Sequence, residues 1–312
     1  MDQAPPNDAA ALCASAHRAR RLDQFYTRDE VAAHCHDTVI EHLRTRKVWY
    51  VEPSAGEGAF FKLLPPDTLA VDIDPRHPDI IKANFLEIAL ASSDDIVVIG
   101  NPPFGKNSSL AVKFFNHAAT FASTIAFILP RTFQKHSIHK RLDPYFHCVF
   151  EEVLDEDSFI FEGERKSVPT VFQIWERRSD RRMVVTLPTT HDDFDITAPE
   201  HPDFKITAPE HAKFAIQRIG SKAGRVHTNF SAKPNAHYFI IAKTKDVEVI
   251  MRSLDLASLA RRTAGNPSLA RTELVAAYVE RKNTLALTQL WLMALVNNQV
   301  RSLVGRGRSE RA

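Results

Sequence analysis

Cysteine is scarce in this sequence, which has only Cys13, Cys35 and Cys148 and no CxxC pair. The odd count and the spacing argue against a disulfide framework and a zinc site, and they indicate a reducing compartment. An excess of charge of one sign is also lacking, because 40 Lys and Arg stand against 38 Asp and Glu. The chain is therefore no polycation, and any contact with nucleic acid must come from local basic patches.

Long hydrophobic runs are absent as well. The most apolar late stretch, Leu285–Val296, is interrupted by Thr288 and Gln289 and is too short to span a bilayer. The first residues include an alanine run followed by arginines, which is not the order of regions in a signal peptide. We therefore expect a soluble, cytoplasmic protein with no membrane partner and no metal ion.

The chain is nevertheless long and apolar enough for a sizeable core, with 312 residues of which 44% are hydrophobic. That length fits one α/β domain and a smaller appended unit. The expected boundaries are a flexible tail over 1–20, the α/β domain over 21–180, a C-terminal region with a terminal helix over 181–300, and a basic tail over 301–312.

Short β-rich runs alternate with longer segments that suit helices, such as Leu110–Phe121. The predicted strands are Val48–Glu52, Leu69–Asp72, Ile96–Ile99, Thr124–Leu129 and Val171–Trp175. Such alternation is typical of βαβ units and predicts a doubly wound, mostly parallel sheet. Ligands of such sheets bind at the carboxyl ends of the strands, so polar residues there are candidates for a site.

The first candidate is Val51–Gly58, in which Glu52 ends a strand and Gly56 and Gly58 follow. The glycines allow a ligand close to the backbone. The segment is neither a GxGxxG fingerprint nor a Walker loop, so a triphosphate is not its natural ligand. An acid at the strand end suits a cationic amino group, as in S-adenosylmethionine. A plain turn is the alternative interpretation.

Two further segments follow the next strand. Asp72, followed by Ile73, lies at the tip of the second predicted strand, where a carboxylate can accept hydrogen bonds from both hydroxyls of a ribose. The pair Asn84 and Phe85 offers a polar edge and an aromatic face to an adenine ring. A helix cap is the alternative for Asp72, and a turn asparagine beside a core phenylalanine is the alternative for Asn84 and Phe85.

The most specific segment is Gly100–Gly105, with the sequence Gly-Asn-Pro-Pro-Phe-Gly directly after a predicted strand. Its two prolines stiffen the loop and fix the direction of its carbonyls. The side-chain oxygen of Asn101 and the carbonyl of Pro102 can accept the two hydrogens of an exocyclic amine, while Phe104 stacks on the base. A sulfonium methyl is already activated, so catalysis would rest on positioning and hydrogen bonding without a metal.

Together, the segments at Glu52–Gly58, Asp72 and Asn101–Phe104 resemble the motifs of the N6-adenine methyltransferases, over most of Leu22–Trp175. The segment Gln24–Thr27 resembles the motif that precedes the first strand in DNA enzymes of this class, which gives the gamma-type motif order. The resemblance implies a seven-stranded Rossmann-like methyltransferase sheet, with the catalytic domain over 21–180. It also implies a target-recognition region over 181–300.

The resemblance also implies a role for each position. Cofactor contacts are expected from Thr27, Glu52, Pro53, Ala55, Gly56, Gly58, Asp72, Ile73, Asn84 and Phe85. Catalysis is expected from Asn101, Pro102, Pro103 and Phe104. The family often has Asp at the position of Asn84 and Tyr at the position of Phe104. It also places a late aromatic against the flipped base; Phe159 and Phe161 are candidates, and a core role is open for either.

A basic stretch stands where the gamma-type order places target recognition. Residues 213–245 include seven Lys or Arg and no acid. Phosphate contacts are expected from Arg218, Lys222, Arg225 and Lys233, with an ordinary solvated face as the alternative. An adenine inside a duplex would have to be extruded at a cost of a few kcal/mol, unless the substrate is single-stranded.

Three functions fit these residues. The favoured one is transfer of a methyl group from S-adenosylmethionine to N6 of adenine in DNA or RNA, with DNA favoured. Because the Asn-Pro-Pro-aromatic motif also occurs in glutamine methyltransferases of release factors, a protein amide is the second candidate substrate. The third is a non-catalytic module that binds cofactor or nucleic acid.

Overall fold

The computed structural model describes residues 26–91, 95–155, 157–161, 164–183, 185–197, 211–230 and 233–309. These residues divide into two compact units, with the main division between residues 184 and 185, and residues 262–265 belong to the first unit. The predicted tail over 1–20 lies outside the described residues, as do Gln24 and Phe25. No described helix is both long and apolar enough to cross a membrane.

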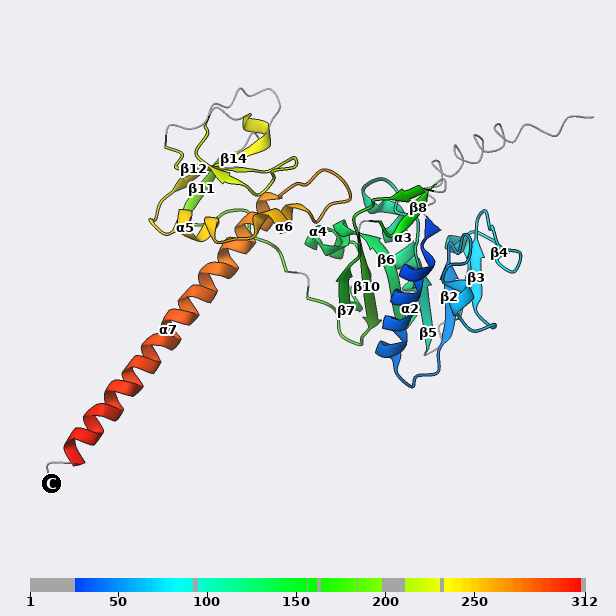
Figure 1. Cartoon of the computed structure of the whole chain (residues 1–312), viewed down its shortest axis with the longest axis horizontal. Coiled ribbons are helices and arrows are strands. Elements are labelled where there is room, and N and C mark those ends of the chain that lie inside the picture. Colours follow the sequence, from blue (N-terminus) through cyan, green and yellow to red (C-terminus); the bar gives the residue numbers. More distant parts are fainter. Residues whose placement is uncertain are drawn as a thin grey trace, which may run out of the picture. The chain divides into compact units, whose positions relative to one another are not determined.

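The first unit is built on a seven-stranded sheet (Figure 1). In spatial order its strands are β4 (Ile81–Lys82), β3 (Leu69–Asp72), β2 (Trp49–Pro53), β5 (Ile96–Gly100), β6 (Thr124–Pro130), β10 (Thr170–Arg177) and β7 (Phe146–Val153). All pairs from β4 to β6 are parallel, whereas β10 is antiparallel to both of its neighbours. This topology confirms the predicted doubly wound, mostly parallel Rossmann-like sheet.

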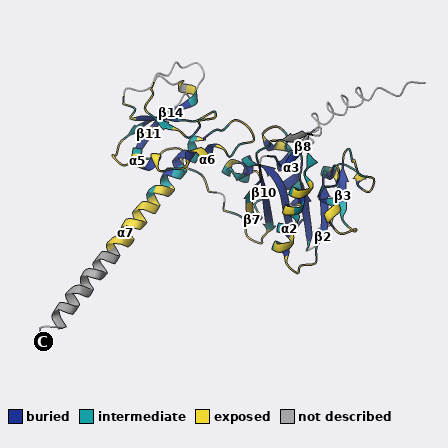
Figure 2. Cartoon of the chain, viewed as in Figure 1, coloured by how far each residue is buried: buried dark blue, intermediate teal, exposed yellow. Residues whose placement is uncertain are grey.

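Helices cover both faces of the sheet. Successive residues of a strand point to opposite faces, so each strand contributes side chains to a core on either side. On one face α2 (Asp29–Leu43) packs Ala32, Cys35 and Val39 into a core that includes alternate residues of β5 and β6. On the other face α3 (Ser109–Ala118) packs against the remaining strand residues and the fully buried Trp175. Every residue of β5 and β6 is buried, and the middle of the sheet is dark blue in Figure 2. Burial on both faces explains why these strands are continuous apolar runs.

Short elements complete the first unit. They are the helix α4 (His136–His139) and the 3-10 turns η1 (Phe61–Leu63), η2 (Phe85–Glu87), η3 (Lys106–Ser108) and η4 (Arg131–Gln134). A separate small sheet joins β1 (Tyr26–Thr27), β8 (Phe159–Phe161) and β9 (Glu164–Lys166), with Thr27 paired to Phe159. This pairing holds the start of the described chain against a segment more than a hundred residues later in the sequence.

The second unit contains a four-stranded antiparallel sheet. Its strands are β11 (Phe194–Thr197), β14 (His237–Ala242), β12 (Phe214–Gln217) and β13 (Val226–His227), in that spatial order, with η5 (Pro234–Ala236) before β14. Its helices are α5 (Val247–Arg252), α6 (Leu256–Ala260) and α7 (Arg271–Ser309). The first turns of α7 pack Leu274, Val275 and Tyr278 into the core of this unit.

The last helix is longer than the sequence analysis expected. A basic tail was predicted over 301–312, but α7 continues to Ser309. Gly305 and Gly307 do not end the helix, because a glycine inside a helix costs only about 1 kcal/mol, far less than a proline. From Asn283 to Met293 the side chains of α7 are exposed, Leu290 and Trp291 included.

The Arg182 side chain holds the segment that follows β10 in place. Its guanidinium donates hydrogen bonds to the carbonyls of His139 (2.7 Å), Asp143 (3.2 Å) and Phe146, and it lies 5.2 Å from the centre of the Trp175 ring. These contacts tie the segment after β10 back to the loop before β7.

We expect Arg182→Ala to lower the free energy of unfolding by roughly 3 kcal/mol, because several carbonyls lose a charged donor at once. Urea denaturation measures the change. The matched control is Arg178→Ala, since Arg178 is exposed and is held through its backbone N–H to Tyr145. Equal stability of the two variants would show that the Arg182 contacts contribute nothing.

Candidate functional site

The site lies where the strand order of the sheet reverses. From β2 the chain continues to β3 on one side, and it returns to β5 on the other side of β2. The loops after β2 and β5 therefore diverge and leave a crevice at the carboxyl ends of the strands, which is where doubly wound sheets bind ligands. A hydrogen bond joins the two loops, because the Ser54 hydroxyl donates to the Asn101 carbonyl at 3.1 Å.

Two cavities of about 470 and 480 Å³ open along this crevice. Both are lined by Tyr26, Ser54, Gly56 and Asn101, so they meet at these four residues. Each volume is in the range of a small-molecule site, and together they offer an elongated space. The first cavity is mostly apolar and includes Phe85, Phe104 and Phe114, whereas the second is lined mainly by polar residues near the start of α2.

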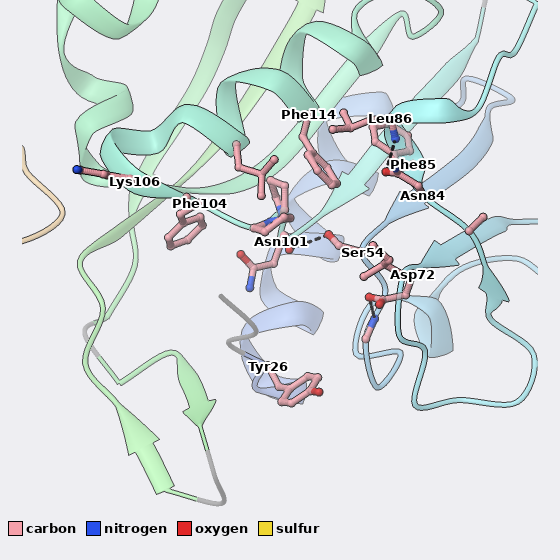
Figure 3. A pocket seen from close by; sticks show the side chains of 17 residues that line it. Tyr26, Ser54, Asp72, Asn84, Phe85, Leu86, Asn101, Phe104, Lys106 and Phe114 are labelled. Carbon is pink, nitrogen blue, oxygen red and sulfur yellow. Dashed lines mark hydrogen bonds between the residues drawn. The ribbon is translucent and has the colours of Figure 1, made fainter. Parts of the chain in front are cut away.

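Asp72 organises the junction between the cavities. Its side chain is buried, and its two carboxylate oxygens accept hydrogen bonds from the backbone N–H groups of Gly56 (2.9 Å) and Asp74 (2.7 Å). A carboxylate has about four acceptor positions, so two positions remain for a ligand. Asp72 lines the first cavity, where Figure 3 shows its bond to the Gly56 backbone.

Position 56 requires a glycine because of its backbone conformation and because of the ring that lies next to it. Its φ is +55°, a left-handed value that side chains rarely adopt, and an added Cβ would lie 3.1 Å from the Tyr26 ring. The Tyr26 ring thus covers the glycine where the two cavities meet. The pKa of the Tyr26 phenol is raised, mainly by burial and partly by nearby acids that include Glu57.

Glu52 is the least satisfied group of the crevice. Its side chain is 2% exposed and lines the second cavity. One carboxylate oxygen accepts a backbone hydrogen bond from Phe61, whereas Oε2 has no hydrogen-bond partner among the described residues. Burial raises the pKa of Glu52 well above its usual value, and the nearby charge of Asp72 adds to the effect. A buried carboxylate without a cation is costly, so a cationic ligand group would relieve it.

For Asn84 and Phe85 the sequence left two interpretations open: a contact with an adenine ring, or a turn asparagine beside a core phenylalanine. The Asn84 side chain caps η2 by accepting from the Leu86 N–H at 3.2 Å, and it donates to Glu87 at 2.8 Å. Phe85 is buried and stacks on Phe114 with ring centres 5.3 Å apart. Both residues also line the first cavity. The turn and core contacts therefore fix two residues that face the crevice.

The loop Asn101–Phe104 lines the first cavity over its whole length, and Asn101 lines the second cavity as well. The Phe104 carbonyl accepts from the backbone N–H groups of Leu110 and Ala111, which anchors the loop to the start of α3. Asn107 and Ser108 have left-handed φ values of 53° and 59°. Such conformations cost of order 1–3 kcal/mol each, and they persist where neighbouring contacts hold them.

The remaining predicted residues differ in whether they line one of the two cavities. Thr27 and Ala55 line the second cavity and Ile73 the first, whereas Pro53 and Gly58 line neither. Phe159 is fully buried in the core beneath α2, which agrees with the core role left open for it. The side chain of Phe161 lies outside the described residues.

The basic candidates all belong to the second unit. Lys222, Arg225 and Lys233 are exposed. Arg218 is half-buried, and its guanidinium lies 5.4 Å from the centre of the Tyr238 ring, so it has a packing role. No group of three or more potential metal ligands occurs among the described residues.

Sequence reasoning missed several lining residues: Tyr26, Ser54, Lys106, Leu110 and Phe114. Tyr26 belongs to the segment Gln24–Thr27, in which only Thr27 was expected to contact the cofactor. Leu110 and Phe114 are spaced by four residues within a predicted helix, which is the signal that would have placed them on one helical face.

No protein-family model and no curated protein matches this sequence. Among solved structures, the chain is similar to the 23S rRNA methyltransferase ErmE, with 21% identity and a TM-score of 0.37 over 51% of this chain and 72% of that one. It is also similar to the magnesium protoporphyrin IX methyltransferase of Synechocystis PCC 6803 with bound SAM, with 11% identity and a TM-score of 0.35 over 57% and 100%. Values this low assign no function to the chain.

Glu52 makes the stability of the ligand-free protein depend on pH. Because its pKa is raised in the folded state, the neutral carboxyl is favoured there, and stability is lost as pH rises from the ordinary pKa of glutamate through the raised one. The slope reaches at most about 1.4 kcal/mol per pH unit. We expect Glu52→Gln to remove this dependence and to be more stable than the wild type at neutral pH. Urea denaturation over a pH series measures it, and identical pH profiles for both proteins would contradict the assignment.

Proposed function

We propose that this protein transfers a methyl group from S-adenosylmethionine to the N6 amine of adenine in nucleic acid, with DNA favoured over RNA. The observation that carries the proposal is the position of Asn101, which lines both halves of one crevice beside Gly56. A cofactor would extend across the junction of the two cavities, and the group that receives the methyl would lie beside it at Asn101.

The residues present fit this cofactor. The unpartnered oxygen of Glu52 suits a cationic amino group, and the free acceptor positions of Asp72 suit the two ribose hydroxyls. The apolar wall around Phe85 and Phe114 suits a flat adenine ring. When bound, the cofactor supplies a methyl group that is already activated by the sulfonium.

The role of the loop after β5 is to hold the target amine. The Asn101 side-chain oxygen and the Pro102 carbonyl would accept the two amine hydrogens, which directs the nitrogen lone pair toward the methyl donor. Phe104 offers a partly exposed ring beside them for stacking on the base. Because the loop is anchored by Ser54 before it and by α3 after it, this geometry is formed before the substrate arrives.

The same proposal assigns a separate function to each part of the chain. Residues 21–180 would form the cofactor-binding catalytic domain, and residues 181–300 would recognise the target. In the second unit, the exposed Lys222, Arg225 and Lys233 would contact phosphates without reading sequence.

We expect Asn101→Ala to lower the rate of methyl transfer at least about a hundredfold, because one of two acceptors for the amine is lost. The measurement is transfer of labelled methyl to DNA and RNA oligonucleotides, followed by nucleoside mass spectrometry to identify N6-methyladenine. Cofactor affinity, measured by calorimetry, should stay within a few-fold of the wild type. Lys113→Ala, at an exposed position of α3 outside both cavities, is the control and should retain full activity.

The other outcomes of this assay decide against the proposal in distinct ways. Label in protein glutamine, with none in nucleic acid, would identify a protein methyltransferase. Cofactor binding without transfer to either class would indicate a binding module. Full activity of Asn101→Ala would disprove the role of the loop.

A further inference from the structure

The half-buried arginines of the first unit differ in whether their guanidinium groups have hydrogen-bond or ion-pair partners. Three of the described arginines between residues 26 and 183 are half-buried: Arg28, Arg131 and Arg182. Arg28 forms an ion pair with Asp157 at 3.2 Å, and Arg182 donates to several carbonyls. Arg131 has no side-chain hydrogen bond or ion pair among the described residues, and its Nε is buried without a partner. A guanidinium in such a position lacks the acceptors that it normally has.

The backbone places Arg131 at the same edge of the sheet as Asn101. Strand β6 runs parallel to β5, with Gly100 paired to Phe127, and Arg131 directly follows the end of β6. The Arg131 N–H donates to the Pro169 carbonyl at 3.1 Å. The hydroxyls of Thr132 and Ser108 are 2.5 Å apart, which joins the loop after β6 to the loop after β5. Arg131 is therefore held next to the segment that follows the Asn101–Phe104 loop.

Lys106 adds a second cation to this side. It is exposed, lines the first cavity, and has no ion pair or side-chain hydrogen bond among the described residues. Figure 3 shows it beyond Phe104, at the end of the crevice away from Asp72. The second cavity is different, since its lining has four acids, Asp29, Glu30, Glu52 and Glu57, against two basic residues, Arg28 and Lys62. A polyanion is thus repelled from one end of the crevice and attracted to the other.

We propose that Arg131, assisted by Lys106, binds a backbone phosphate of the nucleic-acid strand next to the target adenine. The inference rests on the proposed function, and it assigns phosphate contacts to the catalytic unit in addition to the basic residues of the second unit. The planar guanidinium can bind two phosphate oxygens at once, which a lysine cannot do. The contact would fix the register of the strand while Asn101 and Phe104 hold the base.

The test is the salt dependence of binding to a fluorescein-labelled single-stranded DNA oligonucleotide that contains adenines, repeated with RNA of the same sequence. For single strands, each phosphate contact contributes about 0.7 to the slope of log K against log salt. We expect Arg131→Gln and Lys106→Gln each to reduce the slope by about 0.7, and the double variant to reduce it by about 1.4. Lys113→Gln, at an exposed position of α3, is the charge-matched control and should leave the slope unchanged.

Two measurements separate a phosphate contact from a structural role. Arg131→Lys keeps the charge, so it should retain the slope while binding more weakly than the wild type. Methyl transfer by Arg131→Gln should show a raised KM for the oligonucleotide with kcat and cofactor affinity nearly unchanged. If Arg131→Gln lowers thermal stability, Lys106→Gln and Arg131→Lys still provide the test.

The failures can be told apart. If the wild type binds and methylates the oligonucleotide and the slopes of Arg131→Gln and Lys106→Gln equal that of the wild type, the phosphate contact is wrong and the proposed function stands. If the wild type methylates a duplex but binds neither single strand at low salt, the contact is wrong and the proposed function stands. If the wild type neither binds nor methylates any single-stranded or duplex oligonucleotide at low salt, both are overturned.

Discussion

Two buried carboxylates at the ends of neighbouring parallel strands govern this crevice. Asp72 is satisfied by two backbone N–H groups, and in return it fixes the glycine loop after β2. Glu52 receives a single backbone hydrogen bond and keeps one oxygen without a partner among the described residues, so its charge is destabilising in the ligand-free protein. A ligand that brings a positive charge removes this cost. Ligand affinity and the stability of the fold are therefore linked through the same side chain.

The loop after β5 is rigid because it is held at both ends. Ser54 binds the carbonyl of Asn101 at the start, and the carbonyl of Phe104 receives the first N–H groups of α3 at the end. The left-handed residues Asn107 and Ser108 follow at once, and the Ser108 hydroxyl contacts that of Thr132. Neighbouring loops thus offset the local strain, so a substrate amine would meet acceptors that need no rearrangement.

The fold class was predictable because buried parallel strands are continuous apolar runs, as in β5 and β6. The edge strand β7 was not found, since Phe146 is its only buried residue and it includes two acids. Most site residues were found because they follow strands whose carboxyl ends share one edge. Tyr26 was missed because its place depends on the pairing of β1 with β8, which no local pattern reveals. The roles assigned to the site residues stay predictions, whereas their gathering around one crevice is observed.

The position of β10 has a consequence for synthesis of the chain. This strand comes last of the seven in the sequence, yet it lies between β6 and β7. Every residue of β6 is buried, so until Arg177 has left the ribosome a mostly apolar strand has one unpaired edge. Open apolar edges are templates for aggregation. Nascent or truncated chains that end before β10 should therefore depend on chaperones, although all residues that line the crevice have already been made.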